Sequence, residues 1–198
     1  MSERHDELQG MGAAAPVLRA LALWPNVPDC YGWLYLDRRG NWRLGKEREP
    51  VRHAGLTAAI GANYYCTGAG CFFQNGPQRV WVELEMTPYV LRLADAGGER
   101  FVTHNGLAVT HIREAWLDAG GNLGLVSEHG AGIVDDRDLA RLCEQLYAPD
   151  GAAAPDADSA AWLQLGATRL PLTILPPGRS AAMHFGFVTQ PQAAPPGP

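Results

Sequence analysis

The segment from Gly70 to Leu93 most tightly constrains what this chain can fold into. Gln74-Asn75-Gly76-Pro77 predicts a turn, because Asn-Gly accepts the positive φ angles of a tight hairpin and proline cannot donate to a strand ladder. Residues 79–86 then alternate between two sets of side chains, which is the period of a β-strand. The segment therefore predicts a hairpin followed by a strand at residues 89–93. The expected core face carries Val80, Val82, Leu84 and Met86.

The opposite face of this strand carries the candidate ligand-binding residues, which are Arg79, Trp81, Glu83 and Glu85. A solvated strand face explains them, because antiparallel sheets commonly keep one face wet. If a groove covers that face, the same side chains would bind a polar ligand, with the indole of Trp81 as a stacking surface. Both interpretations stay open at this stage.

Short strands separated by glycine-rich turns run through much of the remaining chain and predict an antiparallel meander. Tyr31, Trp33 and Tyr35 share one face of an early strand, where packing in the core or across strands is the usual role of aromatic side chains. Turns are expected at residues 37–40, 95–98, 104–106 and 118–122. Residues 184–189 are expected to form a late strand.

Two helices are predicted to pack on this sheet. The first begins at Pro50, since proline suits the first helical position, and ends at Gly61. The second has Asp135 as its N-cap. Its buried stripe comprises Leu139, Leu142, Cys143 and Leu146, which makes Cys143 a structural residue. The predicted fold class is therefore α+β: a mostly antiparallel, multi-stranded sheet (a β-meander) with two helices, as one body or as two small lobes.

Composition divides the chain into a central domain with low-complexity flanks and one internal linker. The expected divisions are a flexible or disordered N-terminus at 1–23, a main α+β domain at 24–148, a linker at 149–160, C-terminal strands that pack back on the domain at 161–190, and a disordered tail at 191–198.

The charge balance excludes several classes of partner. The net charge is −5 and no basic cluster occurs, so the electrostatic footprint of a nucleic-acid-binding protein is missing. No run of 18 apolar residues predicts a membrane span. The acidic, polar start lacks the pattern of a signal peptide, which favours a cytoplasmic location and four cysteines kept as thiols.

Cys66 and Cys71 form the minor candidate site. Their spacing is not that of a zinc knuckle, and no second pair follows. Buried or half-buried thiols are the ordinary interpretation. The alternatives are a redox-sensing pair, since the glycines between them make the loop pliable, and a nucleophilic cysteine activated by His104 or His111.

The remaining chemical signatures are negative. The six histidines form no helical zinc-binding pair, and neither a phosphate loop nor a dinucleotide fingerprint occurs. No catalytic residue, metal ligand or cofactor is therefore assigned. Glu83 and Glu85 have a spacing that would suit glycoside chemistry, but a solvated strand face explains them better.

Three segments resemble a proteobacterial family of small cytoplasmic proteins of unknown function. They are the CYGWL segment at Cys30–Leu34, the QNGPQRVWVELE segment at Gln74–Glu85 with Thr87-Pro88 after it, and FGF at Phe185–Phe187. The resemblance spans about residues 24–190. It implies no activity, and so no catalytic residues carry over to this chain.

A more distant resemblance involves the turn at Asp37–Trp42 and the element at Glu85–Tyr89. These segments are similar to elements of another uncharacterised bacterial family. That resemblance implies a two-lobed α+β structure with a pleckstrin-homology-like half and a small-ligand site.

The sequence thus favours a non-enzymatic, cytoplasmic small-ligand-binding or regulatory protein that uses the row from Arg79 to Glu85. The first alternative is a thiol-dependent enzyme or redox sensor at Cys66 and Cys71. The second is a structural or partner-binding module. A small-molecule ligand is the expected partner, and the sequence sets no oligomeric state.

Overall fold

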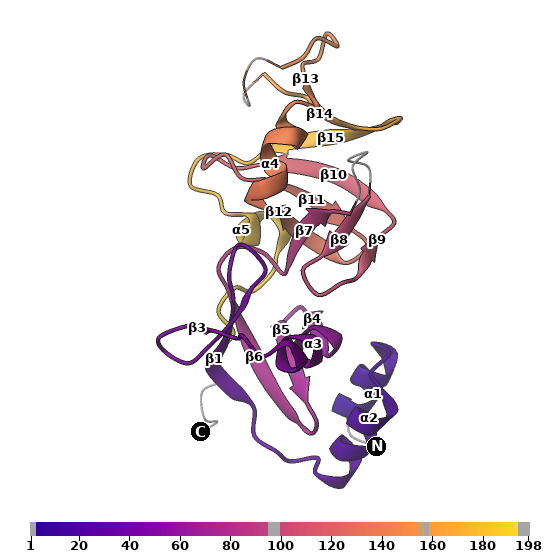
Figure 1. The fold of residues 1–198 in the computed structure, drawn as a ribbon, viewed down its shortest axis with the longest axis vertical. Coiled ribbons are helices and arrows are strands. Elements are labelled where there is room, and N and C mark those ends of the chain that lie inside the picture. Colours follow the sequence, from indigo (N-terminus) through magenta and orange to yellow (C-terminus); the bar gives the residue numbers. More distant parts are fainter. Residues whose placement is uncertain (1–2, 95–99, 155, 157–158, 194–198) are drawn as a thin grey trace. The chain divides into compact units, whose positions relative to one another are not determined.

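A computed structural model describes residues 3–94, 100–154, 156 and 159–193 (Figure 1). The expected turn at residues 95–98 and parts of the expected linker and tail lie outside the described residues. The chain divides into two compact units. The first unit comprises residues 3–37, 41–85 and 188–193, and the second comprises 38–40 and 86–187 of the described chain. The fold is α+β with two lobes, as predicted.

A six-stranded sheet forms the first unit, in the order β3-β2-β1-β6-β5-β4. The predicted hairpin is confirmed: β5 and β6 pair antiparallel, and Asn75 lies opposite Gln78 across a two-residue turn. Gly76 in that turn has φ 56°, a left-handed conformation that glycine adopts at lower cost than residues with a Cβ atom. The bounds are β1 Cys30–Leu36, β2 Trp42–Leu44, β3 Glu49–Pro50, β4 Tyr64–Thr67, β5 Gly70–Asn75 and β6 Gln78–Leu84.

Two N-terminal helices, α1 (Glu3–Gly10) and α2 (Ala15–Leu23), occupy the segment for which a flexible N-terminus was expected. Leu8 and Leu21 are fully buried in one cluster with Phe72 and Trp81 of the sheet. This cluster, together with Ala13, is named the helix-covered cluster. The sequence prediction was wrong here because α1 is polar overall and contributes a single buried side chain, Leu8.

The second unit contains a nine-stranded sheet in the order β13-β14-β15-β10-β11-β12-β7-β8-β9. Most neighbouring strands pair antiparallel, as expected. The pairs β1–β6, β10–β15 and β12–β7 are parallel, so both sheets are mixed and the simple meander is wrong. The bounds are β7 Tyr89–Leu93, β8 Phe101–Thr103, β9 Ala108–Val109, β10 Ile112–Leu117, β11 Leu123–Ser127, β12 Gly130–Val134, β13 Leu146–Tyr147, β14 Trp162–Leu165 and β15 Thr168–Ile174.

Three further helices complete the described chain. Helix α3 (Ala54–Ala62) starts after His53 rather than at Pro50, which lies in β3. Helix α4 (Asp136–Cys143) has Asp135 as its N-cap, as predicted, because the carboxylate accepts a hydrogen bond from the Arg137 amide. The prediction that Cys143 is buried was wrong, since it is exposed while Leu142 faces the core.

Helix α5 (Ala181–Phe185) replaces the strand expected at residues 184–189. The hydroxyl of Ser180 caps its first turn by accepting from the Met183 amide at 3.2 Å. Gly186 ends it with φ 73°, the left-handed conformation common after a helix.

Candidate functional site

A bulge in β1 shapes the first wall of a small pocket in the first unit. Cys30 lies opposite Val80 and Leu34 opposite Val82, so four residues of β1 advance against two of β6. Gly32 in the bulge has φ 70°. The bulge breaks the alternation on which the aromatic face was predicted, and Trp33 is 60% exposed rather than packed in the core.

The loop between β2 and β3, Gly45–Arg48, forms the second wall. The Gly45 amide donates to the Trp33 carbonyl at 2.9 Å, and the Arg48 amide donates to the Gly45 carbonyl at 3.1 Å. Arg48 has φ 53°, and it alone among the described non-glycine residues has a positive φ. Non-glycine residues in this region are uncommon; they occur in tight turns and are enriched at active sites and ligand-binding loops.

The Arg48 guanidinium is held between an acid and a ring. Its Nη2 lies 3.3 Å from Oε2 of Glu83, and its central carbon lies 4.0 Å from the centre of the Tyr35 ring. Tyr35 and Glu83 are opposite each other in the β1–β6 pairing, which brings both to the same place. Burial raises the pKa of the Tyr35 phenol, and the charge of Glu85 raises it further while Arg48 opposes the shift.

These residues enclose a cavity of about 220 Å³, named here the Arg48 pocket. One of the residues that line it is Lys46, the only lysine of the chain, which is exposed. Among the residues that the structure describes, none forms an ion pair with Lys46. The pocket is lined by Gly32, Trp33, Leu34, Tyr35, Gly45, Lys46, Arg48 and Glu83.

The predicted row from Arg79 to Glu85 does not share one exposed face. Trp81 is buried in the helix-covered cluster, and its indole N–H donates to Asp29 at 2.9 Å. Arg79 lies under the N-terminal helices, where it pairs with Glu7 at 2.6 Å and stacks on Phe72 at 3.8 Å. Glu83 lines the Arg48 pocket, and the exposed Glu85 lies near Tyr35.

Cys66 and Cys71 form a disulfide, contrary to the expectation that both are free thiols. They lie directly opposite each other in the β4–β5 pairing, with their Cα atoms 4.0 Å apart. Sequence spacing did not reveal this, because it does not give the hairpin register. Cys30 and Cys143 are free.

A larger cavity, of about 410 Å³, lies in the second unit between the start of β10 and the β14–β15 turn. Its polar lining comes from Thr110, His111 and Thr168. Glu128 receives hydrogen bonds from Thr110 and from the His111 amide. Although partial burial acts to raise it, these bonds lower the pKa of Glu128 to about 2. The Glu128 carboxylate is already hydrogen-bonded to the loop at Thr110 and His111. This cavity is therefore a weaker candidate than the Arg48 pocket for binding a charged ligand.

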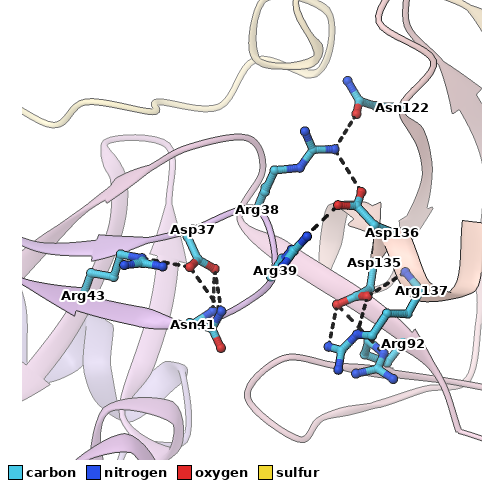
Figure 2. A network of polar contacts seen from close by, with 10 residues as sticks. All are labelled: Asp37, Arg38, Arg39, Asn41, Arg43, Arg92, Asn122, Asp135, Asp136 and Arg137. Carbon is cyan, nitrogen blue, oxygen red and sulfur yellow. Dashed lines mark hydrogen bonds and ion pairs between the residues drawn. The ribbon is translucent and has the colours of Figure 1, made fainter. Parts of the chain in front are cut away.

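The clustered charges at the start of α4 are mutually compensated (Figure 2). The buried Asp135 carboxylate receives two hydrogen bonds from the Arg137 guanidinium, and these hydrogen bonds lower its pKa. Asp136 accepts from Arg38 at 3.0 Å, and Asp138 accepts from Arg92 at 3.0 Å. This network stabilises the start of a helix and offers no uncommitted charge.

Asp37 organises the tip of β1 in the first unit in a similar way (Figure 2). It accepts from the Asn41 amide at 2.8 Å and from the Arg43 guanidinium at 2.9 Å.

In the described part of the chain, no three histidine, cysteine or acidic residues are grouped as a metal site would require. None of the described helices is both long and apolar enough to cross a membrane.

The fold and the pocket thus define a two-unit α+β protein with a small, charged recess beside an exposed indole. The chain belongs to the family DUF2944, described as "Protein of unknown function (DUF2946)", whose model matches residues 14–192. This agrees with the expectation of an uncharacterised family. No curated protein matches the chain.

Two solved structures of DUF1285 family proteins are similar to the chain. The protein from Silicibacter pomeroyi DSS-3 is 17% identical, with a TM-score of 0.50 over 81% of this chain and 96% of that one. The protein from Shewanella baltica OS155 is 15% identical, with a TM-score of 0.41 over 55% and 87%. At 17% identity the first likeness concerns the fold alone.

Sequence reasoning missed most of the Arg48 pocket. Glu83 was predicted, but Trp33 was assigned to the core, and no functional role was predicted for Lys46 or Arg48. One available signal was the uniqueness of Lys46, which lies between Gly45 and two further charged residues in a short loop.

Proposed function

We propose that this protein is a non-enzymatic small-ligand-binding protein whose recognition site is the Arg48 pocket. The ligand class is a small molecule with one anionic group, such as a carboxylate, next to an apolar or planar part. Lys46 and Arg48 bind the anionic group, and Trp33 contacts the remainder. Of the predicted row, Glu83 acts at this site by positioning Arg48.

The single observation that carries this proposal is the state of Lys46. Arg48 is already paired with Glu83 and stacked on Tyr35, whereas Lys46 forms no ion pair within the described residues. A lysine at the edge of a concave site, two positions from an oriented arginine, provides a hydrogen-bond donor and a positive charge for an anion. The paired Glu83 also repels ligands that carry a second negative charge nearby.

The geometry of the loop supports a site that exists before the ligand arrives. The left-handed backbone of Arg48 and the hydrogen bond from Gly45 to Trp33 fix the loop on the bulge of β1. A preformed site costs less ordering entropy on binding. The volume of about 220 Å³ lies below the roughly 300–1,000 Å³ of pockets for drug-sized ligands, so the ligand is small.

A thermal-shift screen tests this function with amino acids, short aliphatic carboxylates and aromatic carboxylates as probes. A probe at one hundred times its dissociation constant should stabilise the protein by about 2.7 kcal/mol, which raises Tm by about 5–10 °C at this length. Titration calorimetry then measures the dissociation constant. We expect Lys46→Gln to weaken binding by about tenfold, the effect of losing one charged hydrogen bond.

Arg19→Ala is the matched control, because Arg19 is an exposed arginine of the same unit with no ion pair to any described residue. It should leave affinity unchanged. Equal losses in Lys46→Gln and Arg19→Ala would show a nonspecific charge effect and contradict the pocket. A screen without any stabilising probe would favour the alternative of a partner-binding module.

Two further expectations belong to this proposal. The cytoplasmic location is one, and cell fractionation tests it. The other is the pleckstrin-homology-like half implied by the distant resemblance, and an experimental structure of the chain tests it.

A further inference from the structure

The Cys66–Cys71 disulfide lies at the end of an edge hairpin. Strand β4 is the last strand of its sheet, and its ladder with β5 ends where Thr67 lies opposite Gly70. The two cysteines form the next pair along this ladder, one pair away from the two-residue turn Gly68-Ala69. The disulfide therefore joins two residues that the turn already brings face to face.

Such a bond contributes less to stability than a disulfide that closes a long loop. The stabilisation by a disulfide grows with the length of the loop that it closes, and here only four residues separate the two cysteines. The register of the hairpin is held independently by the pairs Tyr64–Phe73 and Tyr65–Phe72. The Tyr65 and Phe72 rings also pack against each other, with centres 5.8 Å apart. Because these contacts do not depend on the disulfide, the sheet is expected to persist when the bond opens.

The two sulfur-bearing residues differ in their access to solvent. Cys71 is 2% exposed, because β5 lies inside the sheet between β4 and β6. Cys66 is half-buried on the edge strand. The exposures of the two residues therefore favour attack by an incoming thiolate at Cys66 over attack at Cys71. This asymmetry matches the division between an attacked cysteine and a resolving cysteine in exchange sites.

We propose that Cys66 and Cys71 form a redox-active site that exchanges disulfides with low-molecular-weight thiols. In reduction, a thiolate attacks Sγ of Cys66; a new sulfur–sulfur bond forms, the Cys66–Cys71 bond breaks, and its electron pair leaves on Sγ of Cys71, which takes a proton. A second thiol molecule attacks the external sulfur of this mixed disulfide. It releases the oxidised low-molecular-weight disulfide and the Cys66 thiol. Two thiols thus supply two electrons and two protons.

This site is independent of the Arg48 pocket, since the two share no residue. Either can fail in experiment without the other. In a reducing compartment disulfides are generally transient and take part in catalysis or sensing, and the half-buried position of Cys66 on an edge strand is compatible with that use.

The test uses the full chain with Cys30→Ser and Cys143→Ser, which removes both free thiols and leaves the pair. The folded protein is equilibrated with mixtures of reduced and oxidised glutathione, alkylated, and analysed by mass spectrometry. We expect a reversible two-electron transition between disulfide and dithiol, with circular dichroism unchanged. A pair that glutathione opens only in denaturant, or that never closes from the dithiol, would overturn the proposal.

Single-cysteine variants in the same background test the asymmetry. With Cys71→Ser, oxidised glutathione should form a mixed disulfide at Cys66; with Cys66→Ser, the shielded Cys71 should react more slowly, by on the order of tenfold or more. Equal rates in the two folded variants would overturn the assigned roles. If Cys71→Ser fails to fold, the equilibrium in the variant that retains both cysteines still decides whether the site is redox-active.

Discussion

Arg79 and Arg48 have the same kinds of partner and opposite surroundings. Each guanidinium pairs with a glutamate and lies over an aromatic ring. Arg79 pairs with Glu7 and lies over Phe72, with Trp81 as a second, more distant ring, and Arg48 pairs with Glu83 and lies over Tyr35. The Arg79 side chain is 8% exposed beneath the N-terminal helices, whereas the Arg48 side chain is 48% exposed. The same local chemistry is therefore compatible with a structural role at the buried Arg79 and with the proposed recognition role at the exposed Arg48.

Leu8→Ala should have the largest effect on this comparison, because Leu8 anchors the helices that bury Arg79. It is fully buried in the helix-covered cluster, so truncation removes apolar contacts and leaves a cavity. We expect a loss of about 3 kcal/mol in the free energy of unfolding, measured by urea titration. Leu23→Ala is the control, since Leu23 of the same helix pair is 69% exposed. If Leu8→Ala and Leu23→Ala lower the free energy of unfolding by the same amount, the helices do not pack on the sheet.

Arg79→Ala comes next, at about 2–3 kcal/mol in the same titration. It removes a shielded ion pair with Glu7 and the stacking on Phe72, and it leaves the Glu7 carboxylate without its cation. Arg79→Met should recover part of the loss, because its unbranched chain refills the space without a charge. Equal losses in the two variants would assign the whole effect to the ion pair and none to packing.

The reason why the sequence did not predict this burial lies in the N-terminal helices. The alternation of β6 was correctly predicted, and it places Arg79 and Trp81 on one face of the strand. The N-terminal helices cover that face through contacts between residues about seventy positions apart in the sequence, such as the Arg79–Glu7 pair. Helix α1 is too polar for its sequence to indicate a packing face, and so the part of the strand face at Arg79 and Trp81, which was predicted to be solvated, is buried.

The Arg48 pocket was hidden from the sequence for a different reason. Side-chain alternation holds only while the register is regular, and the bulge at Gly32 turns Trp33 out of the position that the pattern assigned to it. Local signals succeeded where the structure is local, as in the Gly76 turn and the Asp135 cap. The caps of α5, Ser180 and Gly186, were equally local and could have been recognised.

Glu7→Gln separates charge from hydrogen bonding at the covered arginine. The amide keeps an oxygen that can accept from Arg79, so only the ionic part of the contact is lost. We expect a loss of about 1 kcal/mol, smaller than that of Arg79→Ala. Salt provides the check: because the arginine is shielded from solvent, the difference from the unmodified protein should change little between low and high ionic strength. A difference that vanishes in salt would place the pair at the surface.

Arg48→Ala should have the smallest effect on stability, about 0.5 kcal/mol, because an exposed ion pair gains little over hydration. The left-handed backbone conformation at position 48 costs alanine about as much as it costs arginine, so it contributes little to the difference in stability between the two proteins. Arg48→Gly removes that strain and should leave stability equal to or above that of Arg48→Ala. If Arg48→Ala instead costs as much as Arg79→Ala, Arg48 holds its loop in place as a structural residue. The contrast between the two arginines then disappears, and so does the case for a recognition site at Arg48.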